Sequence, residues 1–363
     1  MKINIYLPYK ENFDLNKASA VSISVKNNLF HSFYKNNVRV FGNKTENPIY
    51  ENNFFAVKKS YNFFKSKNKH IAKIMCDIIS NENDQDQIIE IHNRPYIFNY
   101  VLKRLPKKKI CLFFHNNPKD MKGSKTLNER KFILEKASTI YCVSDYIKGE
   151  FLDGINTKHN NIFTLHNGVE RTLKVKSKKD KEILFVGRIV HEKGVHLFVK
   201  AASLLAKEFP DWKYSMIGTT RLGLNSNDSF GKKIIDEFKK IGPQAEYFGF
   251  LNQEMIYKKM SSASVIVVPS IWQEPFGLVL IEAMSFGLAI VTSNYGGIPE
   301  IIEGNGIIID EINHKKIYLA LYELMTNNKK LEKYQNLSWE NFNYSSKLSS
   351  EKLDKYREKL LNS

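Results

Sequence analysis

Short apolar runs alternate along the whole chain with longer segments whose apolar residues recur at helical spacing. This alternation is typical of α/β folds with parallel sheets. In the first half the runs are INIYLP, VRVFG, IIEIH, KICLFFH, TIYCVS and NIFTLHNG, and in the second half EILFVGR, KYSMIG, AEYFGF, SVIVVPS, LAIVTS and GIIID. Two successive series predict two Rossmann-like domains rather than one large sheet.

A lysine-rich segment with few apolar residues separates the two series. In HNGVERTLKVKSKKDKEILFVG, a predicted strand ends at Asn167–Gly168 and a new one begins near Glu182. We therefore expect an N-terminal domain over residues 1–170 and a C-terminal domain over residues 171–340. Residues 341–363 are charged and helical in pattern, and we expect a terminal helix that could cross back to the first domain.

Length and charge narrow the class of protein. The 363 residues suit two domains, and no apolar stretch reaches the length of a membrane-spanning helix. The start, MKINIYLPYKENF, lacks the apolar core of a secretory signal, so we expect a cytoplasmic protein. The formal net charge of +17 permits contact with nucleic acid, an anionic membrane or an acidic substrate. A bias toward lysine throughout the chain is an equal alternative to a functional basic surface.

Two cations follow the first strand of the second series. Arg188 and Lys193 stand in RIVHEKG, directly after EILFVG and before a segment with helical periodicity. Ligands of open α/β sheets bind at the carboxyl ends of parallel strands, where a guanidinium and an ammonium could bind a diphosphate. Taken alone, the pair is better explained as two exposed loop cations.

Two glutamates stand in EPFGLVLIEAM, after the strand SVIVVPS. Seven residues separate Glu274, which precedes a Pro-Phe-Gly turn, from Glu282, which lies in an apolar helix predicted to run from near Gly277 to Phe286. Gly287 suits the position after the helix end. A carboxylate among apolar residues needs hydrogen-bond partners, and ribose hydroxyls would supply them.

The start of that helix predicts an anion site. The backbone N–H groups of Phe276, Gly277 and Leu278 would point out of the helix N-terminus, where the helix dipole also favours negative charge. Together with the cations, these groups could hold a diphosphate between the two glutamates.

These motifs resemble a known family. GRIVHEKG together with EPFGLVLIEAMSFGLAIVTSNYGGIPEII is similar to the retaining, nucleotide-sugar-dependent glycosyltransferases of the GT-B fold, often called family 4, whose E-x7-E motif is matched by Glu274 and Glu282. The resemblance covers the second domain and implies two Rossmann-like domains with a cleft between them. It also implies that Glu274 contacts the transferred sugar, Glu282 the ribose, and Arg188 and Lys193 the diphosphate.

The first domain resembles the family less strongly. KICLFFHNNPKDMKG places His115 at a strand end, where the family often has a histidine near the reacting sugar and acceptor; a structural histidine is the alternative. Ser144, in YCVS, is a weaker candidate for acceptor or support contacts. IIEIHNRPYIF and HNNPKDMKG look most like bacterial enzymes of lipopolysaccharide and surface-glycan synthesis. PYKENFDLNKASAVSISV lacks the glycine loop of many members, so no donor role is assigned there.

Two further segments have competing interpretations. The sequence DQD at Asp84–Asp86 imitates a metal motif of another glycosyltransferase fold, but its polar context predicts a solvated loop. KKSYNFFKSKNKH interleaves cations and aromatic residues, which fits either a solvated surface or an anionic-lipid patch. The residues of that candidate membrane patch are Lys58, Lys59, Phe63, Phe64, Lys65, Lys67 and Lys69.

The function expected from these features is sugar transfer from a nucleoside diphosphate donor to a glycan or glycolipid acceptor. The setting would be bacterial surface polysaccharide or lipopolysaccharide synthesis, at the inner face of the cytoplasmic membrane. We expect no metal cofactor, because Arg188, Lys193 and the helix N-terminus could stabilise the leaving diphosphate. A nucleotide-sugar epimerase, a basic nucleic-acid-binding protein without a recognisable motif, and an inactive subunit are the alternatives; we expect no nucleic-acid partner.

Overall fold

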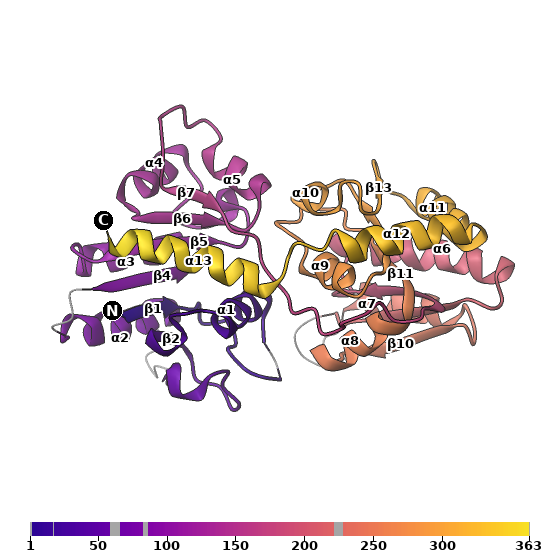
Figure 1. Ribbon diagram of the computed structural model, residues 1–363, viewed down its shortest axis with the longest axis horizontal. Coiled ribbons are helices and arrows are strands. Elements are labelled where there is room, and N and C mark those ends of the chain that lie inside the picture. Colours follow the sequence, from indigo (N-terminus) through magenta and orange to yellow (C-terminus); the bar gives the residue numbers. More distant parts are fainter. Residues whose placement is uncertain (1, 17, 59–65, 83–85, 221–227, 363) are drawn as a thin grey trace. The chain divides into compact units, whose positions relative to one another are not determined.

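Two parallel sheets, each covered by helices, organise the chain (Figure 1). The computed structural model describes residues 2–16, 18–58, 66–82, 86–220 and 228–362. One compact unit comprises Met1–Glu170 together with Tyr344–Ser363, and the other comprises Arg171–Asn343. The predicted α/β class is confirmed.

The first unit has a seven-stranded sheet in the order β3-β2-β1-β4-β5-β6-β7, and all neighbouring strands pair in parallel. The strands are β1 Lys2–Tyr6, β2 Val38–Asn43, β3 Phe54–Val57, β4 Gln87–His92, β5 Lys109–Phe114, β6 Thr139–Cys142 and β7 Ile162–Thr164. The sequence patterns missed β3, which is a short edge strand with Phe55 exposed. The strand order reverses at β1 and β4, which lie side by side.

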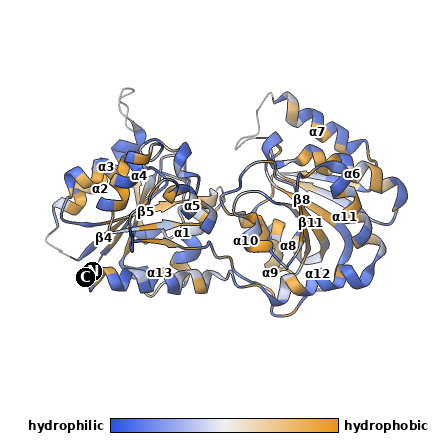
Figure 2. Cartoon of the chain, turned by 90° about the horizontal axis from the view of Figure 1, so that it is seen from above, coloured by the Kyte–Doolittle hydropathy of each residue, from blue (hydrophilic) through white to orange (hydrophobic). Residues whose placement is uncertain are grey.

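Helices cover this first sheet with their apolar residues. They are α1 Ala20–Phe30, α2 Lys67–Ser80, α3 Pro95–Arg104, α4 Leu127–Lys136, α5 Asp145–Leu152 and α13 Ser346–Leu361, with short 3-10 helices at Lys35–Asn37, Glu51–Asn53 and Pro118–Asp120. Figure 2 shows the hydrophobic colouring on the strands and in stripes along the helices that cover them. The core of this layer contains Ile3, Ile5, Val40 and Ile88, all fully or almost fully buried.

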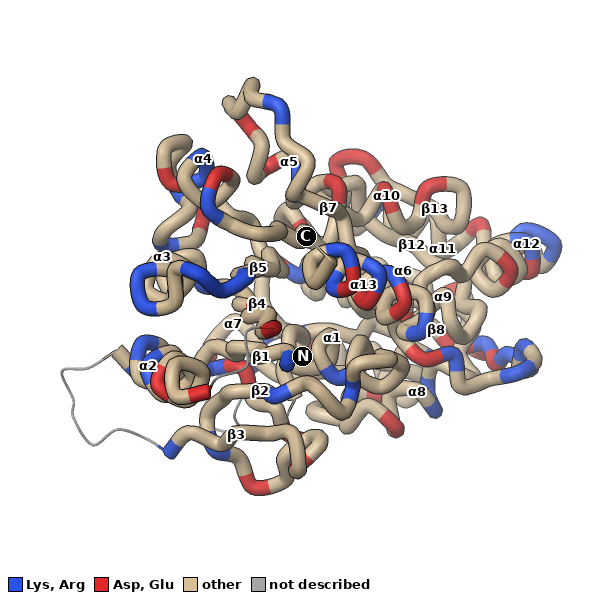
Figure 3. Tube along the Cα trace, turned by 60° about the vertical axis from the view of Figure 1, so that its left-hand side comes forward, with Lys and Arg blue, Asp and Glu red and all other residues tan. Residues whose placement is uncertain are grey.

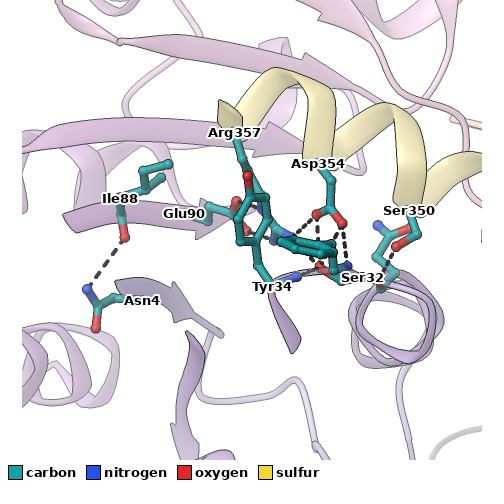
Figure 4. Close-up of polar contacts among 10 residues, drawn as sticks. Asn4, Ser32, Tyr34, Ile88, Glu90, Ser350, Asp354 and Arg357 are labelled. Atoms are coloured by element: carbon teal, nitrogen blue, oxygen red, sulfur yellow. Dashed lines mark hydrogen bonds and ion pairs between the residues drawn. The ribbon is translucent and has the colours of Figure 1, made fainter. Parts of the chain in front are cut away.

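The last helix, α13, packs against α1 in the first unit (Figure 1). Its Arg357 is 1% exposed and donates from Nε and Nη2 to the two carboxylate oxygens of Glu90 on β4, at 2.7 and 2.8 Å (Figure 4). Nη1 of Arg357 donates to Asp354 at 3.0 Å, and the Ser350 hydroxyl donates to the backbone oxygen of Asn28 at 2.7 Å. Because the charges are buried but fully hydrogen-bonded, they fix the register of α13 on the sheet.

The second unit has a six-stranded sheet in the order β10-β9-β8-β11-β12-β13, again parallel. Its strands are β8 Asp180–Val186, β9 Lys213–Ile217, β10 Ala245–Gly249, β11 Ala263–Val268, β12 Ala289–Ser293 and β13 Ile307–Ile309. All six strands predicted for this half are therefore present. The order reverses at β8 and β11, so the loops that leave these neighbouring strands form the place where open α/β sheets bind ligands.

The helices of the second unit bury the apolar positions that the sequence pattern selected. They are α6 Val195–Glu208, α7 Ser229–Lys239, α8 Gln253–Ser262, α9 Leu278–Ser285, α10 Ile298–Ile302, α11 His314–Thr326 and α12 Asn328–Glu340, with a 3-10 turn at His191–Lys193. In α6 the apolar residues that recur at helical spacing are all at most 3% exposed; they are Val195, Phe198, Val199, Ala202 and Leu205. This core holds α6 and the loop before it at the end of β8.

The surface carries the charge in both units. Figure 3 shows Lys and Arg on helices of each, among them α2, α3 and α12. Among the described residues, no helix is both long and apolar enough to cross a membrane. In the candidate membrane patch, Lys58, Lys67 and Lys69 are exposed, and Lys67 lies over the ring of Tyr9 with its nitrogen 4.5 Å from the centroid. Lys59, Phe63, Phe64, Lys65 and the first two residues of DQD lie outside the described residues.

Candidate active site

The loop between β8 and α6 is attached to both neighbouring strands. The backbone N–H groups of Gly187 and Ile189 donate to Ile217 and Thr219 at the end of β9, both at 3.0 Å. Gly194 has φ +65, and a Cβ on it would lie 1.8 Å from the backbone oxygen of Pro269. Only glycine fits there, since it both adopts a left-handed conformation and leaves room for the loop after β11.

This close approach places Lys193 against the loop that carries Glu274. The ammonium Nζ of Lys193 lies 2.5 Å from Oε1 of Glu274. The hydroxyl of Ser270 donates to the same oxygen at 2.5 Å, and Glu274 is 5% exposed. The ammonium also lies 5.5 Å from the centroid of the Trp272 ring. A buried carboxylate is costly without partners, and the lysine and serine supply them here.

A pair of glycines after β12 clamps the backbone of Glu274. Gly297 N–H donates to the backbone oxygen of Glu274 at 2.7 Å, and Gly296 N–H donates to Oε1 of Gln273 at 2.6 Å. Gly296 has φ +63, and a Cβ on it would lie 2.2 Å from that same Glu274 oxygen. The carboxylate is thus held at its backbone and at its side chain. The sequence analysis did not assign these roles to Ser270 or to the glycine pair.

Helix α9 begins and ends as its sequence predicted. Gly277 precedes it with φ +102, and in this described segment no side-chain oxygen caps the helix start. At the other end Gly287 has φ +66; its N–H donates to Met284, and the N–H of Leu288 donates to Ala283. This is the hydrogen-bond pattern of a glycine-terminated helix. The helix therefore presents its positive end beside the Glu274 loop.

Glu282 sits in α9 facing α8. It is half-buried and accepts a hydrogen bond from the hydroxyl of Tyr257 at 3.3 Å, and Tyr257 in turn accepts one from Gln253 at 2.9 Å. Burial raises the pKa of Glu282 to about 7, and the hydrogen bonds from Gln253 and Tyr257 act in the opposite direction. Glu282 therefore changes charge near neutral pH.

The structure brings some of the predicted donor-site residues together and spreads out others. Lys193 and Glu274 are in contact, whereas Arg188 is exposed at the end of β8. The side chain of Phe276 is 3% exposed and belongs to the core, and Leu278 is the first residue of α9. The predicted anion-binding N–H groups of residues 276–278 thus lie where β11 gives way to α9.

In the first unit, His115 follows β5 and contacts a second histidine. Its Nε2 lies 2.8 Å from Nδ1 of His92, the last residue of β4. Its backbone N–H donates to Oδ1 of Asn93 at 2.8 Å. Burial lowers the pKa of His115 to about 4 and that of His92 well below its ordinary value. Both rings are therefore neutral at physiological pH, and the sequence analysis had identified only one of them.

Ser144 has a local structural role. Its side chain is fully buried and accepts a hydrogen bond from the N–H of Ile147 at 3.1 Å, which caps the start of α5. Of the two roles weighed for this residue, the geometry favours support.

Comparison with known proteins identifies the class of enzyme. Residues 169–338 match the family model described as Glycosyl transferases group 1. This stretch is a glycosyltransferase domain. Spore coat protein SA of Bacillus subtilis is 27% identical over 269 residues, covering 68% of this chain and 71% of that protein. The lipopolysaccharide 1,2-N-acetylglucosaminetransferase of Salmonella typhimurium is 24% identical, covering 71% of this chain and 70% of that protein.

Solved structures share the fold of the whole chain. HepE of Anabaena, in complex with UDP and glucose, matches with a TM-score of 0.76 at 14% identity, covering 98% of this chain and 99% of that one. Sucrose-phosphate synthase of Thermosynechococcus elongatus matches with a TM-score of 0.78 at 17% identity, covering 100% of both chains. The predicted GT-B fold, with two Rossmann-like domains, is confirmed, and so is the predicted enzyme class, a glycosyltransferase.

Proposed function

We propose that the protein moves a sugar, with retention of anomeric configuration, from a nucleoside diphosphate sugar to a glycan or lipid-linked acceptor. The observation that carries this proposal is the contact between Lys193 and Glu274 at the ends of β8 and β11, beside the open start of α9. It places a cation, a carboxylate and a helix N-terminus within one unit. HepE, which shares the fold, forms complexes with UDP and with UDP and glucose, which supports a donor of this kind.

The diphosphate is assigned to the positive groups of the second unit. Arg188 is exposed, while Lys193 has three N–H donors and so can hold Glu274 and a phosphate oxygen together. The backbone N–H groups of Phe276, Gly277 and Leu278 complete this assignment. These groups would also stabilise the negative charge that develops on the leaving diphosphate, and the proposal therefore requires no metal ion.

The two glutamates are assigned to the two sugars of the donor. Glu274 has its backbone clamped by Gly297 and one oxygen held by Ser270 and Lys193, so its other oxygen is available to a hydroxyl of the transferred sugar. Glu282, in the helix α9 that follows this loop, accepts hydrogen bonds from the ribose. This order along the donor follows the order of the residues along the loop and helix, in agreement with the family resemblance.

The acceptor side is assigned to the first unit through His115. A neutral imidazole at the end of β5 can exchange hydrogen bonds with sugar hydroxyls without a change of charge. The similarity to a lipopolysaccharide N-acetylglucosaminetransferase, and to a protein from the cps region of Klebsiella pneumoniae, supports a role in surface polysaccharide or lipopolysaccharide synthesis. Work at the inner face of the membrane follows from such acceptors.

The test is direct. The purified chain is titrated by calorimetry with UDP, GDP, ADP and dTDP, and the base that binds then selects the nucleotide sugars for a transfer assay with candidate acceptors. Proton NMR of the product reports the anomeric configuration. Nucleotide release that needs an acceptor, with retention in the product, supports the proposal. Conversion of the donor without an acceptor would instead indicate an epimerase, and salt-sensitive binding of DNA or RNA without nucleotide binding would indicate a nucleic-acid partner.

Membrane association is tested separately by sedimentation with anionic and neutral vesicles. We expect binding to anionic vesicles that falls with salt and with a variant in which Lys58, Lys67 and Lys69 are replaced by glutamate, since each lysine near such a surface contributes about 1 kcal/mol. Equal sedimentation of the variant would remove this patch as the anchor.

A further inference from the structure

The two histidines of the first unit form a pair whose purpose the proposed reaction leaves open. His92 ends β4 and is 2% exposed; His115 follows β5 and is partly exposed. The ring planes lie 18° apart, with Nδ1 of His92 2.8 Å from Nε2 of His115. A nearly coplanar arrangement at this distance is the geometry of a hydrogen bond in the plane of both rings. His92 also stacks on Phe113, with ring centroids 4.3 Å apart, which fixes its own orientation.

Asn93 holds the backbone of His115. It has φ +46, a left-handed conformation that is uncommon for residues other than glycine. In this conformation its N–H donates to the backbone oxygen of Phe113 at 2.9 Å, and its Oδ1 accepts from the N–H of His115 at 2.8 Å. Strained backbone of this kind persists where surrounding contacts enforce it, and such positions concentrate at functional sites. The turn after β4 thus fixes both the backbone and the ring of His115.

The hydrogen-bond network assigns the protons. Two neutral imidazoles joined by one hydrogen bond have one donor nitrogen and one acceptor nitrogen. Nε2 of His92 is buried and, among the described residues, has no hydrogen-bond partner. Orphaned buried N–H groups are rarer in proteins than orphaned acceptors, so this nitrogen carries the lone pair. Nδ1 of His92 then carries the hydrogen and donates it to Nε2 of His115, whose own hydrogen must stand on Nδ1.

The charged groups around the pair favour its neutral state. Burial lowers the pKa of His92 most, and the charges of His115 and of Arg357 on α13 act in the same direction. Arg357 is itself engaged with Glu90 and Asp354. Arg94, which follows the turn, directs its guanidinium to the backbone oxygen of Asn93 at 2.8 Å. With both rings desolvated and Arg357 near His92, the pair takes up no proton in the neutral pH range.

We propose that His92 is a positioning residue for sugar transfer: its Nδ1–H holds His115 in the tautomer whose Nδ1–H donates a hydrogen bond to a hydroxyl of the substrate. This inference rests on the proposed function, because it deepens the role of His115 in that reaction. The ring nitrogen that His92 engages is unavailable to a ligand, so Nδ1 is the nitrogen of the partly exposed His115 that is left to meet a substrate. His115 therefore acts as a hydrogen-bond donor to the sugar and not as a base.

The first test needs no activity. In the full chain labelled with ¹⁵N-histidine, NMR correlation of ring nitrogens and carbon-bound protons reports the tautomer of each histidine. We expect the Nδ1–H tautomer for His115, and a shift toward the Nε2–H tautomer in His92→Phe, which keeps the stacking on Phe113 but removes the hydrogen bond. An Nε2–H tautomer for His115 in the unaltered protein would overturn the proposal, and so would an unchanged tautomer in the variant.

The second test separates positioning from folding. His92→Phe should lower kcat roughly 10- to 100-fold, less than the roughly 10²- to 10⁴-fold typical of losing a positioned acid or base itself because His115 remains, and leave KM for the donor within about twofold. His92→Asn, whose amide can donate at the place of Nδ1, should recover most of kcat. His31→Phe is the matched control. His31 is also a partly buried histidine, but its partner is Glu170, at 2.6 Å, and not His92 or His115. Loss of kcat in the control, or no recovery with asparagine, contradicts the proposal.

Failure of this inference and failure of the proposed function give different results. If no nucleotide sugar is turned over while His115 has the expected tautomer, the proposed sugar transfer is wrong, and the two histidines act on another substrate. If transfer proceeds in His92→Phe at the rate of the unaltered protein, the reaction stands and the positioning role is wrong. Thermal unfolding and nucleoside diphosphate affinity, which depends on the second unit, show whether each variant is folded.

Discussion

Each unit contains a buried ion pair, and the two pairs are built differently. In the first unit, Arg357 and Glu90 are each 1% exposed and joined by two hydrogen bonds, and Asp354 takes a third donor of the guanidinium. In the second unit, the side chains of Lys193 and Glu274 are 23% and 7% exposed, and the lysine contacts one oxygen of the glutamate. The first pair is closed, whereas in the second, among the residues that the structure describes, hydrogen bonds from Lys193 and Ser270 reach only one oxygen of Glu274.

The difference shows how a buried ion pair can be built either as a fixed structural link or as a pair open to a further partner. A planar guanidinium forms a fixed fork with a carboxylate, so Arg357 locks α13 onto β4 and cannot exchange partners easily. A lysine ammonium on a flexible stem can turn toward a second anion while it keeps the first. Lys193 lies on a glycine-bounded loop at a strand end with its side chain 23% exposed, whereas the side chain of Arg357 is buried between α13 and β4 and is 1% exposed.

The largest expected effect is on stability in the closed pair. Arg357→Met should lower the free energy of unfolding by about 3–5 kcal/mol, because the charge of Glu90 is left buried without a partner. Denaturant unfolding of the full chain measures this change. Adding Glu90→Gln should recover part of it, since the uncompensated charge is then removed. A single variant as stable as the unaltered chain would show that α13 is held by its apolar contacts alone.

The open pair should respond in activity more than in stability. Lys193→Ala should cost about 2–4 kcal/mol in transition-state stabilisation, by analogy with loss of a group that stabilises a developing anion. Its effect on unfolding should be smaller than that of Arg357→Met, because Ser270 still donates to Glu274. Steady-state kinetics and unfolding of the same sample give both values. Near-normal turnover would exclude the assignment of Lys193 to the diphosphate.

Glu282 should make nucleotide binding depend on pH. If the ionised carboxylate accepts hydrogen bonds from the ribose hydroxyls, as proposed, its pKa, raised to about 7, makes affinity fall about tenfold between pH 8 and pH 6. Glu282→Gln should bind more weakly at pH 8 and lose this dependence. Calorimetry at several pH values measures both. A Glu282→Ala variant that is folded and keeps full affinity would remove the ribose role.

The same carboxyl also links stability to pH. Its pKa is higher in the folded chain than the ordinary value near 4.5, so its contribution to stability is complete below that value and is lost as pH rises through about 7. Compared with Glu282→Gln, the unaltered protein should therefore lose stability as the pH rises from about 4.5 to about 7. Thermal unfolding over this range, without nucleotide, should show the difference between the two proteins; parallel curves would contradict it.

The smallest expected effect is that of a chelator. If Arg188, Lys193 and the start of α9 stabilise the leaving diphosphate, a chelator should leave turnover within about twofold, since no metal carries that charge. Steady-state assays with and without EDTA, followed by added Mg²⁺ or Mn²⁺, measure it. Activity that vanishes with EDTA and returns with one ion would overturn the metal-free assignment.

The sequence by itself determined the features that depend on neighbouring residues. Apolar runs predicted all six strands of the second sheet, because strands buried on both faces need continuous apolar sequence. Helical spacing selected the buried side of α6, and Gly287 marked the end of α9, because a left-handed position after a helix favours glycine. The motif around Glu274 and Glu282 likewise lies within one loop and one helix, so its local pattern could be read directly.

The tertiary structure alone decided which distant residues meet. Lys193 and Glu274 are 81 positions apart, and Arg357 and Glu90 are 267 apart, so no local pattern links them. His92 was passed over because a lone histidine at a strand end gains meaning only when the next strand sets His115 beside it. The edge strand β3 was missed since FFAV is short and pairs on one side only. Strand order brings these positions together, because parallel strands far apart in sequence end at the same edge of a sheet.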